Sequence, residues 1–226
     1  MSRRRWCDFP SNRTLWQWVS VVTEPLGHYI VLANPSYRSF CHEVARTYKE
    51  VVQTNHQTAT IFDLNAALFD PVLQDRERFD HGSHRWPWVE AELQRLSNCG
   101  ALILVYPIWF GGPPAILKGY VDRVLGAQCA LTDFQSGTGQ PAVRGRYLLS
   151  ISTSGATAEW LSERGQQHAL REGFDTYIER GFGLRDGGHI NLDGIVHNMS
   201  SDHAAKALAR VREAAESMCS RLAAAS

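Results

Sequence analysis

The run Gly-Ala-Leu-Ile-Leu-Val-Tyr, residues 100–106, constrains the fold more than any other stretch of this chain. Each position is apolar, whereas a strand with one face in water would alternate apolar and polar residues. The run therefore predicts a strand buried on both faces, as in the middle of a parallel sheet. Since parallel strands are joined by long crossovers, helices are expected on both sides of that sheet.

Similar short runs recur along the 226 residues, separated by segments with helical periodicity. We predict further strands at 28–33, 58–64, 146–153 and 188–196. The predicted helices cover about 39–55, 86–97 and 114–125, a segment around 170–178 and a C-terminal stretch. The pattern predicts one flavodoxin-like α/β domain, 28–226, with a doubly wound parallel sheet in the order 2-1-3-4-5. Residues 1–27 are predicted to be an N-terminal arm whose role the sequence does not indicate.

Composition excludes several classes of protein. Lys+Arg and Asp+Glu number 23 each, and this zero net charge argues against a nucleic-acid partner. The five cysteines are scattered without a Cys-x-x-Cys motif, which indicates reduced thiols in a cytoplasmic protein. No apolar run approaches the ~18 residues of a membrane span. No metal site is predicted, because His81 and His84 lack a third ligand nearby.

In doubly wound sheets the ligand binds beyond the carboxyl ends of the strands, where three loops are expected here: 34–41, 107–114 and 152–160. The first loop offers Ser36, Arg38 and Ser39 at the start of a helix, a combination that suits a phosphate. The alternative is that Ser39 only caps its own helix.

The second and third loops offer groups that suit a planar heteroaromatic ligand. Trp109 and Phe110 stand beside Gly111 and Gly112, and Pro114 is suited to the first turn of the next helix. Alternatively, both rings fill the core beneath the loop. The third loop, from Ser152, carries small hydroxylated residues that could donate to such a ligand or simply form a turn. A Gly-x-Ser-x-Gly elbow is absent, which disfavours a serine hydrolase.

The stretch YPIWFGGPPAILKGYVDRVL, residues 106–125, resembles the flavin loop and following helix of flavodoxin-like NAD(P)H:quinone oxidoreductases. This family includes the DT-diaphorase, modulator-of-drug-activity and potassium-efflux-ancillary proteins. The stretches 31–41, 63–73 and 150–156 are similar to other family elements in the same order. The resemblance covers roughly residues 28–200.

The resemblance implies a homodimer that binds FAD or FMN and uses NADH or NADPH. In that family hydride passes to flavin N5 and then, in a ping-pong reaction, to a quinone. The implied catalytic residues are Trp109, Trp160 and His168, with Gln166 as an alternative to His168. The implied flavin-binding residues are Asn34, Arg38, Ser39, Phe40, Cys41, Pro107, Ile108, Trp109, Phe110, Ser152, Thr153, Ser154 and Gly155.

Four positions depart from the family pattern: Asn34 replaces a His, Cys41 an Asn, Ser154 a Gly and Trp160 a Tyr. The sequence leaves three alternatives open. One is an azo- or nitroreductase that uses the same reduced flavin. Another, which the departures at Asn34, Cys41 and Trp160 keep open, is a regulatory subunit that docks on a potassium-efflux antiporter. The third is a structural protein that binds no flavin.

Overall fold

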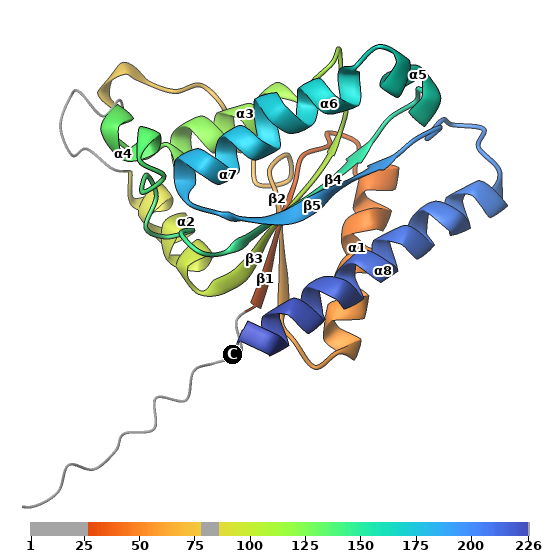
Figure 1. The fold of residues 1–226 in the computed structure, drawn as a ribbon, viewed down its shortest axis with the longest axis horizontal. Coiled ribbons are helices and arrows are strands. Elements are labelled where there is room, and N and C mark those ends of the chain that lie inside the picture. Colours follow the sequence, from red (N-terminus) through yellow and green to blue (C-terminus); the bar gives the residue numbers. More distant parts are fainter. Residues whose placement is uncertain (1–26, 78–85, 226) are drawn as a thin grey trace, which may run out of the picture.

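The computed structural model describes residues 27–77 and 86–225 (Figure 1). The predicted arm lies outside the described residues except for Gly27, and so do His81 and His84. The strands are β1 Gly27–Leu32, β2 Ala59–Asp63, β3 Cys99–Pro107, β4 Tyr147–Thr153 and β5 Arg185–Leu192. The helical segments are α1 Phe40–Thr54, η1 Asp75–Glu77, α2 Pro87–Ser97, α3 Ala115–Tyr120, η3 Val121–Leu125, α4 Leu131–Gln135, α5 Ala158–Glu163, α6 Gln166–Leu170, η4 Arg171–Thr176, α7 Tyr177–Phe182 and α8 Ser201–Ala225.

The five strands form one parallel sheet in the order β2-β1-β3-β4-β5, which confirms the predicted topology. All nine residues of β3 are buried, as its continuous apolar run predicts. The order reverses between β1 and β3, because β1 leads outward to β2 while β3 leads to β4 and β5. A switch point of this kind opens a crevice at the carboxyl ends of the strands.

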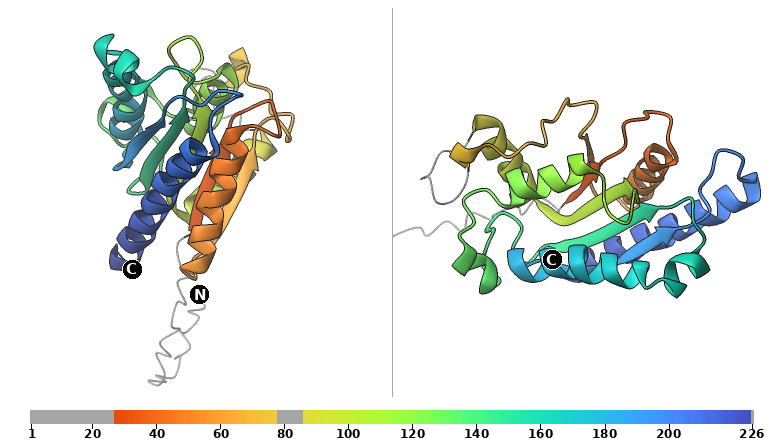
Figure 2. Two further views of the ribbon diagram at one scale, coloured as in Figure 1. Left: turned by 90° about the vertical axis from the view of Figure 1, so that its right-hand side faces the viewer. Right: turned by 90° about the horizontal axis from the view of Figure 1, so that it is seen from above.

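Alternate side chains of each strand enter two separate cores. Tyr29, Val31 and Leu104 belong to the core that includes residues of α2, α3 and α7. Ile30 and Ile103 belong to the core under α1 and α8. Figures 1 and 2 show α1 and α8 together on one side of the sheet and α3, α6 and α7 on the other. The predicted stripe of the helix after β3 is buried as expected: Leu117, Tyr120, Val121, Val124 and Leu125.

Three elements differ from the sequence-based expectation. The fifth strand covers 185–192 instead of 188–196, since it begins before a glycine pair and ends at the turn that contains Gly194, whose φ is 63°. The predicted helix near 170–178 is part of a longer helical segment made of α6, the π-helical η4 and α7. Likewise α3 continues into the π-helical η3. π-Helical turns are rare and occur frequently near functional sites.

A polar cluster attaches the segment after β2 to η3. The buried guanidinium of Arg123 pairs with Glu77 at 2.8 Å and donates to the backbone carbonyl of Asp70. It also lies over the ring of Trp88, 4.8 Å from the ring centre. The neighbouring backbone approaches Gly119 so closely that a Cβ there would overlap Pro71. Only glycine therefore fits at position 119.

Within residues 27–77 and 86–225, none of the helices combines the length and apolar character that crossing a bilayer requires.

We expect Gly119→Ala to lower the free energy of unfolding by about 1–3 kcal/mol, because the added methyl would force the Pro71 backbone away. Gly173→Ala is the matched control, since a Cβ at this helical glycine meets nothing within 4 Å. That variant should be neutral or more stable by up to about 1 kcal/mol. Urea denaturation of both variants measures the difference, and equal effects would contradict the close approach at Gly119.

Candidate functional site

The three predicted loops meet at the carboxyl edge of the sheet. The Ile108 amide donates to the Thr153 carbonyl at 2.7 Å and joins the second loop to the third. The Cys41 thiol contacts the Thr153 hydroxyl at 3.4 Å and joins the first loop to the third. Residues from three distant stretches of sequence therefore form one continuous site at this edge.

The first loop leaves the start of α1 available for a ligand. Ser39 is the N-cap residue, but its hydroxyl makes no capping hydrogen bond to a backbone amide of the helix. It pairs instead with Nδ1 of His42 at 2.9 Å, and His42 Nε2 pairs with Asp63 at 2.9 Å. The alternative that Ser39 simply caps its helix is therefore wrong. An uncapped helix N-terminus attracts anions through its exposed amides and its dipole.

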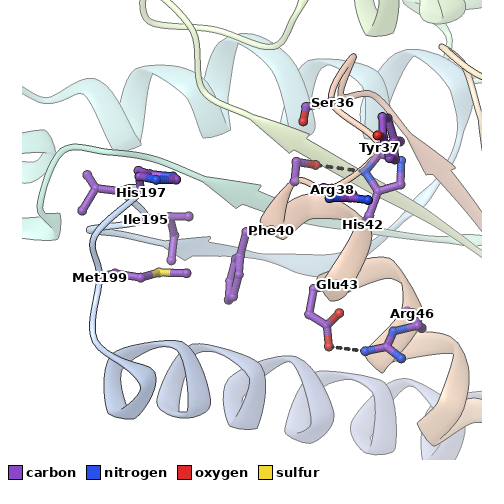
Figure 3. Close-up of a pocket in the computed structure, with 12 residues that line it drawn as sticks. Ser36, Tyr37, Arg38, Phe40, His42, Glu43, Arg46, Ile195, His197 and Met199 are labelled. Atoms are coloured by element: carbon purple, nitrogen blue, oxygen red, sulfur yellow. Dashed lines mark hydrogen bonds and ion pairs between the residues drawn. The ribbon is translucent and has the colours of Figure 1, made fainter.

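A cavity of about 780 Å³ opens beside this helix start. Arg38, His42 and Arg46 bring basic side chains to it, with Glu43 paired to Arg46. Figure 3 shows these polar residues on one side of Phe40, with Ile195 and Met199 on the other. The cavity therefore has a basic end at α1 and a less polar end at the loop before α8.

Asn34 and Cys41 support the first loop from within. The Asn34 carbonyl oxygen accepts from the Ser36 amide at 3.0 Å, which closes a side-chain turn. Burial raises the pKa of the Cys41 thiol, although hydrogen bonds from Thr153 and Asn34 oppose this effect. A neutral, buried thiol is a poor nucleophile, so Cys41 is suited to packing and hydrogen bonding.

The second loop is a tight turn with two exposed rings. Trp109 and Gly112 exchange backbone hydrogen bonds of 2.9 and 3.1 Å around the turn. The Trp109 side chain is 46% exposed and Phe110 is fully exposed, so the alternative that both rings fill the core is wrong. Phe110 has φ of 48° and Gly111 has φ of 92°. A bulky residue in the left-handed region is strained, and such strain concentrates at functional sites.

The third loop begins inside the core and ends at the surface. Ser152, Thr153 and Ser154 are buried, whereas Gly155 is exposed. The Ser154 hydroxyl donates to the Ala156 carbonyl at 2.9 Å, while its amide donates to Leu192 at 2.9 Å. The loop is therefore held rigidly between β4 and β5.

The predicted catalytic residues occupy different surroundings. Trp160 is 45% exposed and stacks with Arg164, whose guanidinium carbon lies 4.6 Å from the ring centre. Gln166 lies against the second loop, since a Cβ built on Gly111 would be 2.6 Å from its side-chain nitrogen. His168 lines a separate cavity of about 320 Å³ together with Arg171 and His189. A catalytic role for Trp109, Trp160 and His168 stays a prediction.

Sequence reasoning missed two sets of polar residues at this edge. His42 follows Ser39 by three positions, a spacing that places both on one turn of a helix, and this signal could have revealed the pair. The second set is Ser150, Asp175, His189 and Asn191, which together with the predicted Ser152 form one hydrogen-bonded group behind the third loop. Nothing in the sequence connects Asp175 with His189, because an irregular helix and a strand bulge determine their meeting.

Comparisons with known proteins agree with this architecture. A protein family described as having a flavodoxin-like fold matches residues 28–217. The chain is 27% identical to the NAD(P)H:quinone oxidoreductase from Methanothermobacter marburgensis, with a TM-score of 0.72. That match covers 84% of this chain and 94% of the solved one.

Two curated relatives match shorter parts of the chain. An uncharacterized NAD(P)H oxidoreductase from Haemophilus influenzae is 29% identical over 147 residues, 64% of this chain and 72% of the relative. NAD(P)H dehydrogenase [quinone] 1 from Cavia porcellus is 28% identical over 145 residues. The latter match covers 56% of this chain and 53% of the relative, so it spans about half of that protein.

We expect Phe110→Gly to keep or raise the free energy of unfolding by about 0–1 kcal/mol, because glycine relieves the positive φ of 48°. Ile108→Ala should lower it by about 2 kcal/mol, since the Ile108 side chain packs on the core. Chemical denaturation of both variants checks the contrast. A large loss of stability in Phe110→Gly would show that the ring contributes to the fold.

Proposed function

The chain belongs to the flavodoxin-like family of NAD(P)H:quinone oxidoreductases, and we propose that it binds a flavin where its three loops meet. The observation that carries the proposal is the turn at Trp109 and Phe110, which holds two exposed rings at the carboxyl edge of the sheet. Phe110 is strained at positive φ, both rings lie in solvent, and a planar ligand would cover them.

The start of α1 suits the phosphate of such a cofactor. The Ser39 hydroxyl pairs with the His42 side chain instead of the backbone amides of α1, and Arg38 and His42 border the adjoining cavity. The amides of Phe40 and Cys41 occupy the first turn, where backbone N–H groups favour an anion. Asp63 holds His42 in place and accepts amides of Asn65 and Ala66 at 3.0 and 3.1 Å.

We infer that the cofactor is FAD rather than FMN, because the cavity extends beyond the place expected for the first phosphate. It continues beyond Phe40 to Ile195, His197 and Met199, well past the start of α1 (Figure 3). A phosphate at the helix N-terminus alone would leave this less polar end unused. Phe40 and Met199 could contact a second planar group, which FAD has in its adenine and FMN lacks.

The ring system of the flavin would lie against the second and third loops. Trp109 and Phe110 would pack on it, and the Gly155 backbone would face its polar edge, since the Ser154 amide and carbonyl already pair with Leu192 and Ile195. A bound flavin supplies the hydride chemistry by which electrons pass from NADH or NADPH to a quinone. The protein's part is to orient the ring, exclude water and present amide dipoles to negative charge. Trp160 and Gln166 stand next to that site and are suited to contacting the second substrate.

We also propose that the chain forms a homodimer. A partly apolar groove of about 470 Å³ runs between η3 and η4 and includes Leu73, Leu131 and Tyr177. These three side chains are exposed in the single chain. Exposed apolar residues gathered around a groove are typical of a protein–protein contact.

Sedimentation velocity of the full chain, with Tyr177→Asp as the disrupting variant, tests this assignment.

The purified full chain should be yellow, or become yellow on incubation with FAD, and the colour should bleach on addition of NADPH or NADH. Trp109→Ala should raise the Kd for the flavin about tenfold, because loss of ring stacking costs about 1–2 kcal/mol. Trp109→Phe, which keeps a planar ring, should retain most of the affinity. A chain that stays colourless with both FAD and FMN would refute the proposed function.

Met199→Ala separates the two flavins. If FAD extends along the cavity, this variant should weaken FAD about threefold or more while leaving the affinity for FMN unchanged. Arg38→Ala should weaken both, because the phosphate next to the ring is common to FAD and FMN. Fluorescence titration with each flavin measures these constants. Equal losses for FAD and FMN in Met199→Ala would favour FMN as the cofactor.

A further inference from the structure

A chain of buried hydrogen bonds runs behind the third loop, and we call its members Asp175, His189, Ser152, Asn191 and Ser154 the polar chain. Asp175 Oδ2 is 2.5 Å from His189 Nδ1, and His189 Nε2 is 2.7 Å from the Ser152 hydroxyl. Ser152 in turn contacts Asn191 Oδ1 at 3.1 Å, and Asn191 Nδ2 contacts the Ser154 hydroxyl at 3.4 Å. The polar chain therefore leads from a carboxylate on a helix to the edge of the sheet.

Two backbone irregularities bring these residues together. Asp175 lies in the π-helical segment η4. His189 follows a bulge at which the pairing of β4 with β5 shifts between Leu148 and Leu149, next to Gly188 with φ of 103°. The bulge places His189 opposite Ser150 and Asn191 opposite Ser152. Since a shift of one residue exchanges the two faces of a strand, the bulge aims His189 toward Asp175.

The polar chain has access to solvent at His189, next to its Asp175 end. The His189 side chain is only 6% exposed, yet it lines the cavity of about 320 Å³ that also contains His168 and Arg171. Protons can therefore reach His189 from the side of α6. The other end is Ser154, in the loop that we propose to contact the flavin.

The number of hydrogen atoms in the polar chain determines the direction of its hydrogen bonds. Asp175 accepts from Ser150 at 2.5 Å and from His189 Nδ1–H. The structure has Ser152 donating to Asn191, so the single Ser152 hydrogen is not available to Nε2. In this arrangement His189 donates through Nε2 as well, so the Asp175–His189 pair holds one extra proton. Moving the Nδ1 proton onto Asp175 gives the same pattern, because the pair still holds one extra proton.

Loss of that proton reverses the pattern. A neutral His189 with hydrogen on Nδ1 has a bare Nε2, to which the Ser152 hydroxyl must donate. Asn191 then has to turn its amide nitrogen toward Ser152 and its oxygen toward Ser154. The Ser154 hydroxyl, which donates to the Ala156 carbonyl in the structure, becomes the donor to Asn191. The charge of the Asp175–His189 pair changes from zero to −1 in the same step.

We propose that Asp175 and His189 are positioning residues that hold one proton, and that this proton sets the hydrogen bonds and the charge behind the flavin-binding third loop. The inference rests on the proposed function. With the proton bound, the pair adds no net charge and an anionic cofactor binds more tightly. Without it, the negative pair opposes such a ligand.

Other titratable groups face this pair. The Tyr106 ring stands edge-on to His189 from β3, with ring centres 6.4 Å apart. Burial raises the pKa of Glu179 in α7 to about 7, so its titration must be removed from the experiment. The remaining groups around the pair are His168 of α6, Arg171 of η4 and Asp186 of β5, with Arg171 paired to Asp186 at 2.7 Å.

The first test uses NMR of the full chain without flavin, in the wild type and in a Glu179→Gln background. When the His189 ring loses its proton, the side-chain amide of Asn191 and the backbone amide of Ser154 should shift over the same pH range. His189→Gln should abolish these shifts. Ser152→Ala should leave the His189 titration in place while uncoupling Asn191 from it. The proposal is overturned if Asn191 and Ser154 do not follow His189, or if they still titrate in His189→Gln.

The second test measures the Kd for FAD across that pH range by fluorescence. In the wild type the affinity should fall about fivefold as the pair loses its proton, a change at the lower end of ordinary coupling between sites. His189→Gln should remove the dependence. His28→Gln is the matched control, since His28 is a buried histidine bonded to Tyr48 and Gln57 at the other end of the sheet. That variant should keep the dependence.

The outcomes of the two proposals are distinguishable. A wild type that binds FAD with the same affinity at every pH overturns the positioning role and leaves the flavin proposal intact. A wild type that binds no flavin refutes the proposed function, and the NMR titration still decides whether the polar chain responds to His189.

Discussion

The burial of β3 on both faces is the constraint on which the rest of the structure depends. The backbone groups of its nine buried residues need hydrogen-bond partners along both edges, and the parallel strands β1 and β4 supply them. Those pairings create the switch point between β1 and β3, where the loops after the strands can meet. The hydrogen bonds of Thr153 to the first and second loops then close the site. The apolar strand β3 thus determines where the polar loops of the site come together.

The edge of the sheet is less regular than its centre, and the irregularities carry local costs. Phe110 is held at positive φ with its ring in solvent, and the Ser39 hydroxyl does not cap α1. A chain selected for stability alone would place glycine at the first position and a capping hydrogen bond at the second. Both departures occur where we propose that the flavin lies. The strained Phe110 and the missing cap at Ser39 are therefore consistent with the proposed function.

The fold was predictable from sequence because its signals are local. The apolar run 100–106, the strand spacing and the Pro-initiated helix after it needed no tertiary information. The three loops were also predictable, since parallel topology brings strand ends to one edge. Two features could not be predicted from sequence: the first residue of the strand that carries His189, and the contact of the His189 side chain with Asp175. They depend on a bulge and a π-helical turn, and such features follow from packing rather than from residue preferences.

Two buried carboxylates on the same side of the sheet show why the polar chain differs from an ordinary structural network. Glu92 accepts from the hydroxyls of Tyr29 and Tyr120 and from Arg95, three groups that can each only donate to it. Its hydrogen bonds have one possible direction. Asp175 is joined to an imidazole, which can donate or accept at Nε2, and the next groups are a hydroxyl and an amide that can reverse. Only the second arrangement can pass a change of protonation to a loop.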